Sequence, residues 1–396
     1  MKTNPSIQLC QTIPVLTVAL LACLGCKTAS DHPYLTTQTP ITLLSSNDGE
    51  INQLFQLNSE QTTDWELKTK DSFTVIHLGP NHPPIIKTVY DTAPTFIMGT
   101  PSMAMSKDGR FGLITNHGWR PPEFQKFQLP PGPKTNADLT VEMLDQTHLT
   151  AQHANIVSLI DLADANYPVV HRVLLDDFPI HVLRHPDGDR FFVGASKHFY
   201  VFKIVKSKLI EISRSPHSHG MPHFWFTPKG DRIIATQAVS KIPLIPGKGG
   251  KMAFICQRAN NSGKDYSDIL IADLTLEKPE ITSFIEDAAD GIESFAFHPN
   301  GKMAVATGLG TYHNCIVVLD IATKPIRVLY TLDAKGISQG IEFSPEGDKL
   351  FVGSPTAGRI EVFDVVGDYE LRKNPKFLNI GFGHNSLTIG PRYQSK

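Results

Sequence analysis

The chain has 396 residues, of which 41% are hydrophobic, and it contains 29 glycines and 29 prolines. This size and composition fit one large all-β domain or two ordinary domains. The 37 Lys and Arg residues nearly balance the 39 Asp and Glu residues, and no basic block occurs in the sequence. Charge therefore gives no support to nucleic-acid binding, and we expect no nucleic-acid partner.

Residues 1–22 have the pattern of an export signal. A positively charged start precedes an apolar run over residues 13–25, which has the length of a signal-peptide core and is too short to span a bilayer. The run ends in residues 20–26 (LLACLGC), which resemble the lipobox of bacterial lipoproteins. The resemblance implies lipidation of Cys23, with Cys26 as the alternative site and an ordinary cleaved signal as the competing interpretation. Several acyl chains on one cysteine anchor a protein firmly, so we expect an exported lipoprotein held on the lipid bilayer and facing the periplasm or the cell surface.

The mature chain is predicted to have two parts. Residues 23–40 are predicted to be a tether, since the polar stretch before the first repeat is rich in Thr, Ser and Pro. Residues 41–396 are predicted to form a single domain. An exported compartment permits disulfides, but the few cysteines there, including Cys256 and Cys315, define no pairing.

One motif recurs along this domain: a short strand, a tight turn that ends in glycine, and a second apolar strand. In the copy at residues 224–236, an aromatic strand precedes Pro228, which presets φ, and Gly230, which accepts a positive φ. The turns of six copies lie at residues 46–49, 106–109, 185–188, 227–230, 298–301 and 344–347, with a degenerate seventh at 389–392. Their spacing indicates a unit of about 40–45 residues, lengthened by insertions.

Each unit continues with an apolar third strand that ends in Asp, a turn and an outer fourth strand. The clearest third strands lie at residues 156–161, 269–273, 316–320 and 360–364. Four strands per unit and six or seven units predict an all-β protein with a β-propeller fold, because ring closure buries the faces that one unit cannot bury alone. We expect seven four-stranded blades, with six as the alternative, and ring closure by pairing of residues 33–57 with residues 384–390. A pair of β-sandwiches or a solenoid is the competing interpretation.

The Pro-Asp-Gly turn and the third strand of Val-x-Asp type resemble the lactonase-like, YVTN-type seven-bladed β-propellers over roughly residues 70–390. That family includes 6-phosphogluconolactonase-type and carboxymuconate-lactonising-type propellers, together with exported proteins without assigned activity. The resemblance implies the fold, whereas one fold hosts many functions. In the enzyme members, a Gly-Pro-Arg-His sequence opens one inner strand. The corresponding residues 220–223 are Gly-Met-Pro-His, so His223 is retained and the arginine that would recognise a carboxylate is absent.

Polar residues recur where the inner strands begin, when these strands are aligned on the turn proline. Inner strands of a propeller share one axial mouth, so we expect these residues to line a ligand site, with Arg120 at the root of a nearby loop. They are His181, His223, Glu293, Gln339, His384, Asn385 and Ser102. Predicted insertions near 118–153 and 239–267 connect second to third strands and leave from the same face. His185 and His298 occupy turns and are expected to be solvated.

Three functions remain open for this mouth. The first is a small-molecule site, with lactonase-like hydrolysis if Glu293 or His223 acts as the catalytic general base. The second is a metal-dependent enzyme in which His181, His223 and His384 hold a divalent metal such as zinc, copper or iron. The third is an envelope scaffold that binds a protein partner without chemistry. The sequence names neither the substrate nor a cofactor.

Overall fold

A computed structural model of the chain divides into two compact units, Met1–Tyr34 and Leu35–Lys396. The described residues are 33–47, 72–90, 102–116, 155–177, 179–188, 190–195, 197–216, 224–226, 228–230, 232–235, 244–247, 250–253, 258–259, 265–273, 280–290, 292–309, 314–334, 339–355, 357–380 and 384–394. Every secondary-structure element within these ranges is a β-strand, and no helix in them could cross a membrane. The signal sequence, Cys23 and Cys26 lie outside the described residues, and so do residues 23–32 of the predicted tether.

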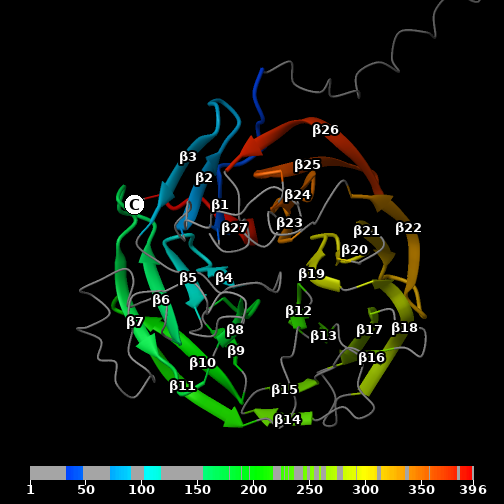
Figure 1. Ribbon diagram of the computed structural model, residues 1–396, viewed down its shortest axis with the longest axis horizontal. Helices are drawn as coiled ribbons and strands as arrows, with labels where there is room; N and C mark the ends of the chain where they lie inside the picture. The colour runs from blue at the N-terminus through cyan, green and yellow to red at the C-terminus, as the bar shows by residue number, and fades with distance from the viewer. Residues whose placement is uncertain are drawn as a thin grey trace, which may run out of the picture. The chain divides into compact units, whose positions relative to one another are not determined.

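The second unit is built from antiparallel sheets, each running from an inner to an outer strand, and we number the four-stranded paths as blades 1 to 6 (Figure 1). Blade 1 has the order β27 (His384–Pro391), β1 (Ile41–Asn47), β2 (Ser72–Leu78), β3 (Ile85–Val89). Blade 2 has β4 (Met103–Met105), β5 (Phe111–Asn116), β6 (Ile156–Asp161), β7 (Val169–Leu174). Blade 3 has β8 (Pro179–Arg184), β9 (Phe191–Ala195), β10 (His198–Val205), β11 (Lys208–Pro216). Blade 4 has β12 (Phe224–Phe226), β13 (Arg232–Ala235), β17 (Asp265–Asp273), β18 (Glu280–Asp290), and β16 (Arg258–Ala259) also pairs with β17. Blade 5 has β19 (Ile292–Phe297), β20 (Met303–Leu309), β21 (Asn314–Asp320), β22 (Arg327–Asp333). Blade 6 has β23 (Ile341–Phe343), β24 (Lys349–Ser354), β25 (Arg359–Val366), β26 (Glu370–Asn379). Strands β14 (Leu244–Gly247) and β15 (Gly250–Ala253) form a separate hairpin within the predicted insertion near 239–267.

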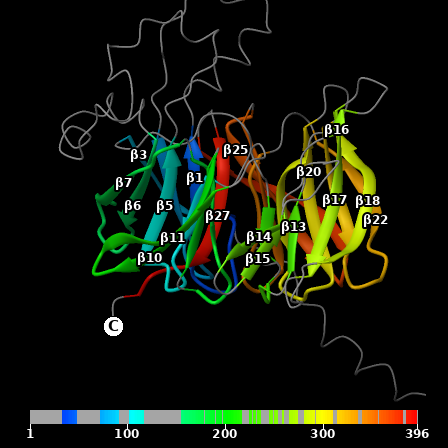
Figure 2. The same ribbon diagram turned by 90° about the horizontal axis from the view of Figure 1, so that it is seen from below.

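The blades form a closed ring with the inner strands around its axis, which is a β-propeller (Figure 1). Figure 2, turned by 90°, shows the strands running through the thickness of this ring. Ring closure joins the two ends of the chain, since β1 pairs with β27 in a register that places Ile41 opposite Pro391. The predicted pairing of the N-terminal segment with the C-terminal strand is therefore confirmed.

The described strands make six blades, so the expected count of seven is not confirmed. The repeat copies at residues 46–49 and 389–392 explain the difference. Ser46 and Asn47 do not lie in a turn after an inner strand but at the end of β1, the second strand of blade 1. Ile389 to Pro391 belong to β27, the inner strand of the same blade. The two weak copies thus contribute to one blade.

The turn between the first two strands of a blade has the predicted chemistry. In blade 2, Ser106 Oγ donates a hydrogen bond to Asp108 Oδ1 (2.7 Å), which also accepts one from the amide of Arg110 (3.1 Å). The glycines that end the turns of blades 2 to 6 all have φ between 70° and 102°: Gly109, Gly188, Gly230, Gly301 and Gly347. Only glycine adopts this conformation without steric cost, which explains its recurrence.

The aspartates that end the third strands hold the next turn. Asp161 Oδ1 accepts a hydrogen bond from the amide of Ala163 (3.0 Å), and Asp320 Oδ1 accepts one from the amide of Ala322 (3.0 Å). A carboxylate that accepts from a backbone amide two residues later stabilises the turn locally. The predicted third strand ending in Asp is confirmed at the ends of β6 and β21.

Aromatic side chains at the inner hairpins pack neighbouring blades together. Trp225 of β12 is buried, and its ring centroid lies 5.7 Å from that of Phe295 in blade 5. On the other side, Phe226 lies 5.2 Å from Phe192 of blade 3. Burying apolar faces between blades is the main stabilising contribution in such a ring.

The expectation that His185 and His298 are solvated was wrong. His298 is 7% exposed, its Nε2 donates to the carbonyl oxygen of Gly347 in blade 6 (2.8 Å), and its ring packs edge-on against Phe343. The ring of His185 lies edge-on against Phe226 of blade 4 at 4.8 Å. Each turn histidine therefore contacts the following blade, since the turns of adjacent blades lie side by side.

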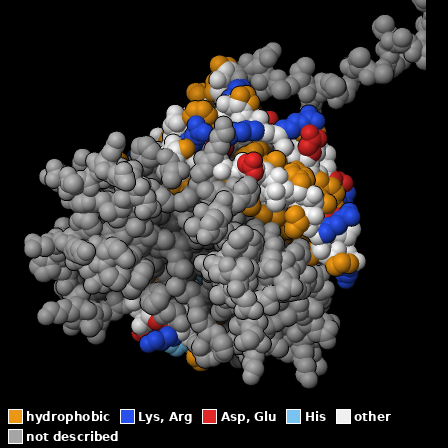
Figure 3. All heavy atoms as spheres, turned by 45° about the vertical axis from the view of Figure 1, so that its right-hand side comes forward, with side chains coloured by type: hydrophobic (Ala, Val, Ile, Leu, Met, Phe, Trp, Pro, Cys, Tyr) orange, Lys and Arg blue, Asp and Glu red, His pale blue; other side chains and the backbone are white. Residues whose placement is uncertain are grey.

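The outer strands carry charges of both signs, which are interspersed on the described surface in Figure 3. On blade 6, Glu361 pairs with Arg359 (2.6 Å) and with Lys373, and Glu370 pairs with Arg372 (2.6 Å). Exposed pairs of this kind contribute little to stability. Side chains in chemically less common environments lie on the axis of the ring instead.

Candidate functional site: an axial cavity

Several predicted mouth residues connect adjacent blades. Ser102 is fully buried at the start of β4, where its amide donates to Ser386 Oγ of blade 1 (3.0 Å). The same link recurs between blades 5 and 6, because Ser294 Oγ accepts a hydrogen bond from the amide of Gly340 (2.9 Å). The alignment of the inner strands on the turn proline therefore has a structural meaning. In these blades the serine hydroxyl groups at the strand starts connect one inner strand to the next.

His384 is held between two blades. Its side chain is fully buried, its Nε2 donates to the carbonyl oxygen of Gln339 in blade 6 (2.7 Å), and its Nδ1 lies 2.6 Å from Ser45 Oγ of β1. Burial lowers the pKa of His384 to about 4, although the hydrogen bond to Gln339 opposes the shift. The ring is therefore neutral near pH 7, and both of its nitrogens have protein partners.

The other predicted site residues are placed as follows. His181 is fully buried in β8 and lies against Gly194, where a Cβ would come within 2.8 Å of its Nδ1. Gln339 is buried beside β23. The backbones of Glu293 and Asn385 lie in β19 and β27, with their side chains outside the described part, and His223 and Arg120 lie wholly outside it.

The proposed metal ligands are only partly described. Within the described ranges, no three His, Cys, Asp or Glu side chains come together as a metal site. The predicted set of His181, His223 and His384 includes one residue outside these ranges. A divalent metal at the mouth stays a prediction.

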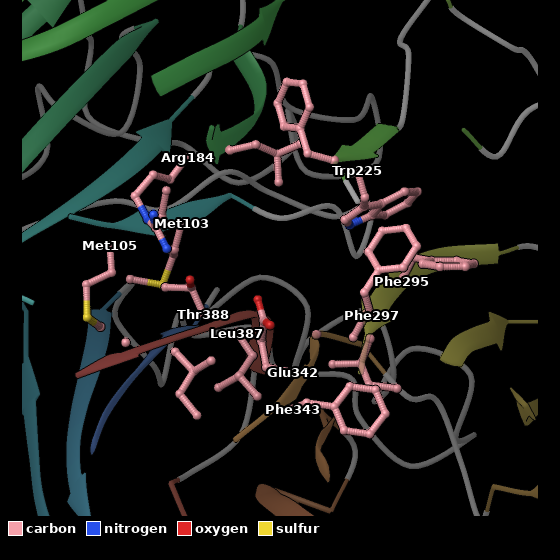
Figure 4. Close-up of a pocket in the computed structure, with 18 of the residues that line it drawn as sticks. Met103, Met105, Arg184, Trp225, Phe295, Phe297, Glu342, Phe343, Leu387 and Thr388 are labelled. Carbon is pink, nitrogen blue, oxygen red and sulfur yellow. The ribbon is translucent and has the colours of Figure 1, made fainter. Parts of the chain in front are cut away.

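A cavity of about 410 Å³ lies on the axis, within the size range of small-molecule pockets (Figure 4). All six inner strands contribute to it. It extends from the level of Ser294 and Ser386 to the turn prolines of several blades, including Pro186, Pro299 and Pro345. The cavity therefore lies deeper along the axis than the strand starts that the sequence analysis emphasised.

Two charged side chains enter this cavity from opposite blades. Arg184 ends β8 in blade 3, and Glu342 lies in β23 in blade 6, with two blades between them in either direction around the ring. Figure 4 shows both side chains directed into the cavity. Among the described residues they do not approach closely enough to form an ion pair, so a space separates the two charged groups.

The pKa values of both groups are shifted. Burial raises the pKa of Glu342 to about 8, because an ionised carboxylate is poorly solvated there, and the positive charge of Arg184 only partly opposes this. Burial also lowers the pKa of Arg184, while Glu342 and Asp187 oppose the shift, and an arginine remains charged at neutral pH. The site therefore holds a guanidinium opposite a carboxyl group that is mostly protonated at pH 7.

The remaining walls are mainly apolar. Trp225 and Phe295 lie on one side in Figure 4, and Met103 and Met105 lie on the other. Thr388 of β27 adds a hydroxyl near Arg184. An apolar pocket with a few convergent polar groups is the usual form of a small-molecule site.

Sequence reasoning missed Arg184 and Glu342, although a signal was present. Arg184 stands two residues before its turn proline, where blades 4, 5 and 6 have Phe226, Phe297 and Phe343. Glu342 stands three residues before its proline, a position that is apolar in blades 3 to 5. A charge at an otherwise apolar position of a repeat indicates a local function, because burying it there is costly.

Comparison with solved structures supports the fold. A proposed 6-phosphogluconolactonase from Bacteroides uniformis has a TM-score of 0.57 at 12% identity, covering 89% of this chain and 100% of that one. A second from Bacteroides fragilis has a TM-score of 0.55 at 13% identity, covering 90% and 99%. The periplasmic gluconolactonase of Pseudomonas aeruginosa has a TM-score of 0.54 at 11% identity, covering 89% and 99%.

The chain has a lactonase-like β-propeller fold. At these identities the similarity concerns the fold alone. No family model matches the chain, and no curated protein matches it by sequence. Activity must therefore be argued from the site.

Proposed function

We propose that this protein is an exported, lipid-anchored β-propeller that binds a small organic molecule in its axial cavity. One observation carries the proposal: Arg184 and Glu342 enter a 410 Å³ cavity from opposite blades without forming an ion pair with each other. Holding two such groups in a low-dielectric cavity is unfavourable unless a ligand uses them. The protein-partner alternative stays open for the mouth, where Arg120 and His223 are predicted to lie.

Ligand binding is tested by thermal unfolding with a panel of sugars, sugar acids, aromatic acids and amines. We expect at least one compound to raise the Tm of the wild-type protein, because a ligand that binds only the folded state stabilises it. Arg184→Gln should abolish this shift, whereas Arg372→Gln on the outer strand β26 should preserve it. If no compound in the panel shifts Tm, or if Arg184→Gln responds like the wild type, the axial cavity is not the ligand site.

A second candidate function is lactone hydrolysis. It is favoured by the structural similarity to gluconolactonase-type propellers and by the raised pKa of Glu342, a property common to catalytic acids and bases. In this reaction water adds to the lactone carbonyl while Glu342 takes a proton from it, the bond from the carbonyl carbon to the ring oxygen breaks, and Glu342 returns the proton to that oxygen, which leaves as a hydroxyl. Arg184 would stabilise the oxyanion. Glu293 and His223 are the alternative bases at the mouth.

Turnover of lactones measured in a pH-stat, corrected for spontaneous hydrolysis, tests this candidate. The rate should rise with pH towards 8 as Glu342 loses its proton, and Glu342→Gln should remove it. If Glu293→Gln abolishes turnover and Glu342→Gln does not, the reaction belongs to the mouth. If no lactone is hydrolysed above the spontaneous rate, the enzyme candidate is rejected and the binding function remains.

The lipid anchor is a separate part of the proposal, and it rests on the lipobox-like residues 20–26. Expressed with its signal in a bacterial host, the wild-type protein should be found in the membrane fraction, and Cys23→Ser should move it to the soluble fraction. Cys26→Ser is the matched control and should stay with the membrane. The reverse result would assign the anchor to Cys26. If both variants stay in the membrane fraction, lipidation at Cys23 and lipidation at Cys26 are both contradicted.

A further inference from the structure

We propose that the axial cavity selects small monocarboxylic acids that carry an aromatic or other apolar ring, and that in alkaline solution it takes up a proton with each molecule bound. This inference rests on the proposed ligand-binding function and specifies its ligand class.

The positions of the two charged groups support an anionic ligand. Arg184 and Glu342 face one cavity from blades 3 and 6, and they are the only charged residues among those described along its lining. A guanidinium presents paired N–H donors that match the two oxygens of a carboxylate. A ligand carboxylate between the two groups would therefore replace the ion pair that they do not make with each other.

The expected uptake of a proton on ligand binding follows from the position of Glu342. An ionised Glu342 would repel a bound carboxylate, whereas a protonated Glu342 donates a hydrogen bond to it. Burial already raises the pKa of this group to about 8, and a nearby anion raises it further. The free site is partly ionised at pH 8 and above, so binding in that range must take up a proton.

No other described group competes for this role. The other strands that line the cavity are β4, β8, β12, β19 and β27, and apart from Arg184 these strands and their turns present Met, Val, Leu, Ile, Trp, Phe, Ala, Pro, Ser and Thr side chains to it. Asp187 acts on Arg184 from the turn after β8. The titration of the axial site above pH 7 is therefore assigned to Glu342.

The preference for a ligand with an apolar ring follows from the aromatic walls of the cavity. Trp225 and Phe295 lie on the side of the cavity away from Arg184 and Thr388, and Glu342 lies between these two groups (Figure 4). A molecule with a carboxylate at one end and a ring at the other matches this division, because aromatic walls favour stacked or edge-on rings.

Three probes with one skeleton test the charge selection: 4-hydroxyphenylacetate is an anion, 4-hydroxyphenylethanol is neutral and tyramine is a cation. Gluconate serves as an anion without an apolar ring. Isothermal titration at pH 7 should show the aromatic acid binding at least about tenfold more tightly than the other three, a difference of one good charge-assisted contact. Equal binding of the neutral compound would overturn the charge selection, and equal binding of gluconate would overturn the ring selection.

The proton is tested with the wild-type protein alone. Affinity for 4-hydroxyphenylacetate should fall about tenfold from pH 7 to pH 9, the change in the protonated fraction of a group with a pKa of about 8. At pH 8.5 the binding heat should differ between buffers of different ionisation enthalpy by the amount for about one proton. A flat affinity over this range, with no buffer dependence, would overturn the proton coupling.

Matched variants show which residues cause the charge selection and the proton uptake. Arg184→Gln should weaken binding of the acid at least about tenfold, whereas Arg190→Gln, in the same blade and outside the cavity lining, should not. Glu342→Gln should bind within about threefold of the wild type at pH 7 and lose the fall in affinity at pH 9. If Glu342→Gln keeps the wild-type pH dependence, the proton belongs to another group. If no probe of any class binds, the proposed ligand-binding function itself fails, which is a different outcome from unselective binding.

Discussion

Gly353→Ala is expected to destabilise the propeller by about 3 kcal/mol or more, at the upper end of the usual cost of overpacking. A Cβ at this position in β24 would overlap the ring of His384 and the carbonyl oxygen of Gln339. The ring cannot turn aside, because Nε2 and Nδ1 both have hydrogen-bond partners in its fully buried site. The clash lies where blade 6 meets the strand that closes the ring, so the ring closure itself is strained.

Denaturant unfolding of the wild type and the variant measures this effect. Gly301→Ala is the control, because its added Cβ meets nothing within 4 Å among the described residues. Its φ of 70° makes alanine cost about 1 kcal/mol through backbone strain alone. Equal loss of stability in the two variants would mean that the His384 ring is not fixed between the blades.

Glu342→Gln is expected to stabilise the ligand-free protein by about 4 to 5 kcal/mol at pH 9 and by less than about 1 kcal/mol at pH 5. Burial raises the pKa of Glu342 to about 8 in the folded state, whereas an exposed glutamate titrates near 4.5. The folded protein therefore holds this proton more tightly than the unfolded chain. Its contribution to stability is complete below pH 4.5 and is lost as the pH rises through 8. Glutamine is similar in shape and does not ionise, so it removes that loss.

The free energy of unfolding at pH 5, 7 and 9 tests this prediction, with Glu370→Gln on the exposed edge of β26 as the control. Burial lowers the pKa values of His77 and His384 to about 4. Each of these histidines therefore lowers the stability of the folded protein as the pH falls below 6.5. This loss is common to wild type and variant, and it cancels in their difference. Parallel pH profiles for the wild type and Glu342→Gln would show that Glu342 is not buried as described.

A carboxyl group that lowers the stability of the free protein is typical of a functional site. The same reasoning separates Glu342 from His384. His384 has its hydrogen bonds satisfied by Ser45 and Gln339, so its burial supports the fold. Glu342 faces a cavity opposite Arg184, and its unfavourable ionisation at high pH becomes useful when an anion binds.

The local repeats were predictable from the sequence. Turn glycines such as Gly188 and strand-ending aspartates such as Asp320 act within a few residues of the chain, so their chemistry is visible in a short window. The pairing of β1 with β27 was also predicted, as the pairing of the N-terminal segment with the C-terminal strand. The sequence therefore determined the fold class and the way the ring closes.

The tertiary structure decided which side chains of these strands meet in the closed ring. It placed two weak repeat copies in one blade, and it directed the polar strand starts at Ser294 and Ser386 towards neighbouring blades. It also brought Arg184 and Glu342 into one cavity from strands three blades apart. Which side chains meet across the axis depends on how many blades close the ring and how each is rotated, and these are properties of the packing between blades rather than of any one repeat.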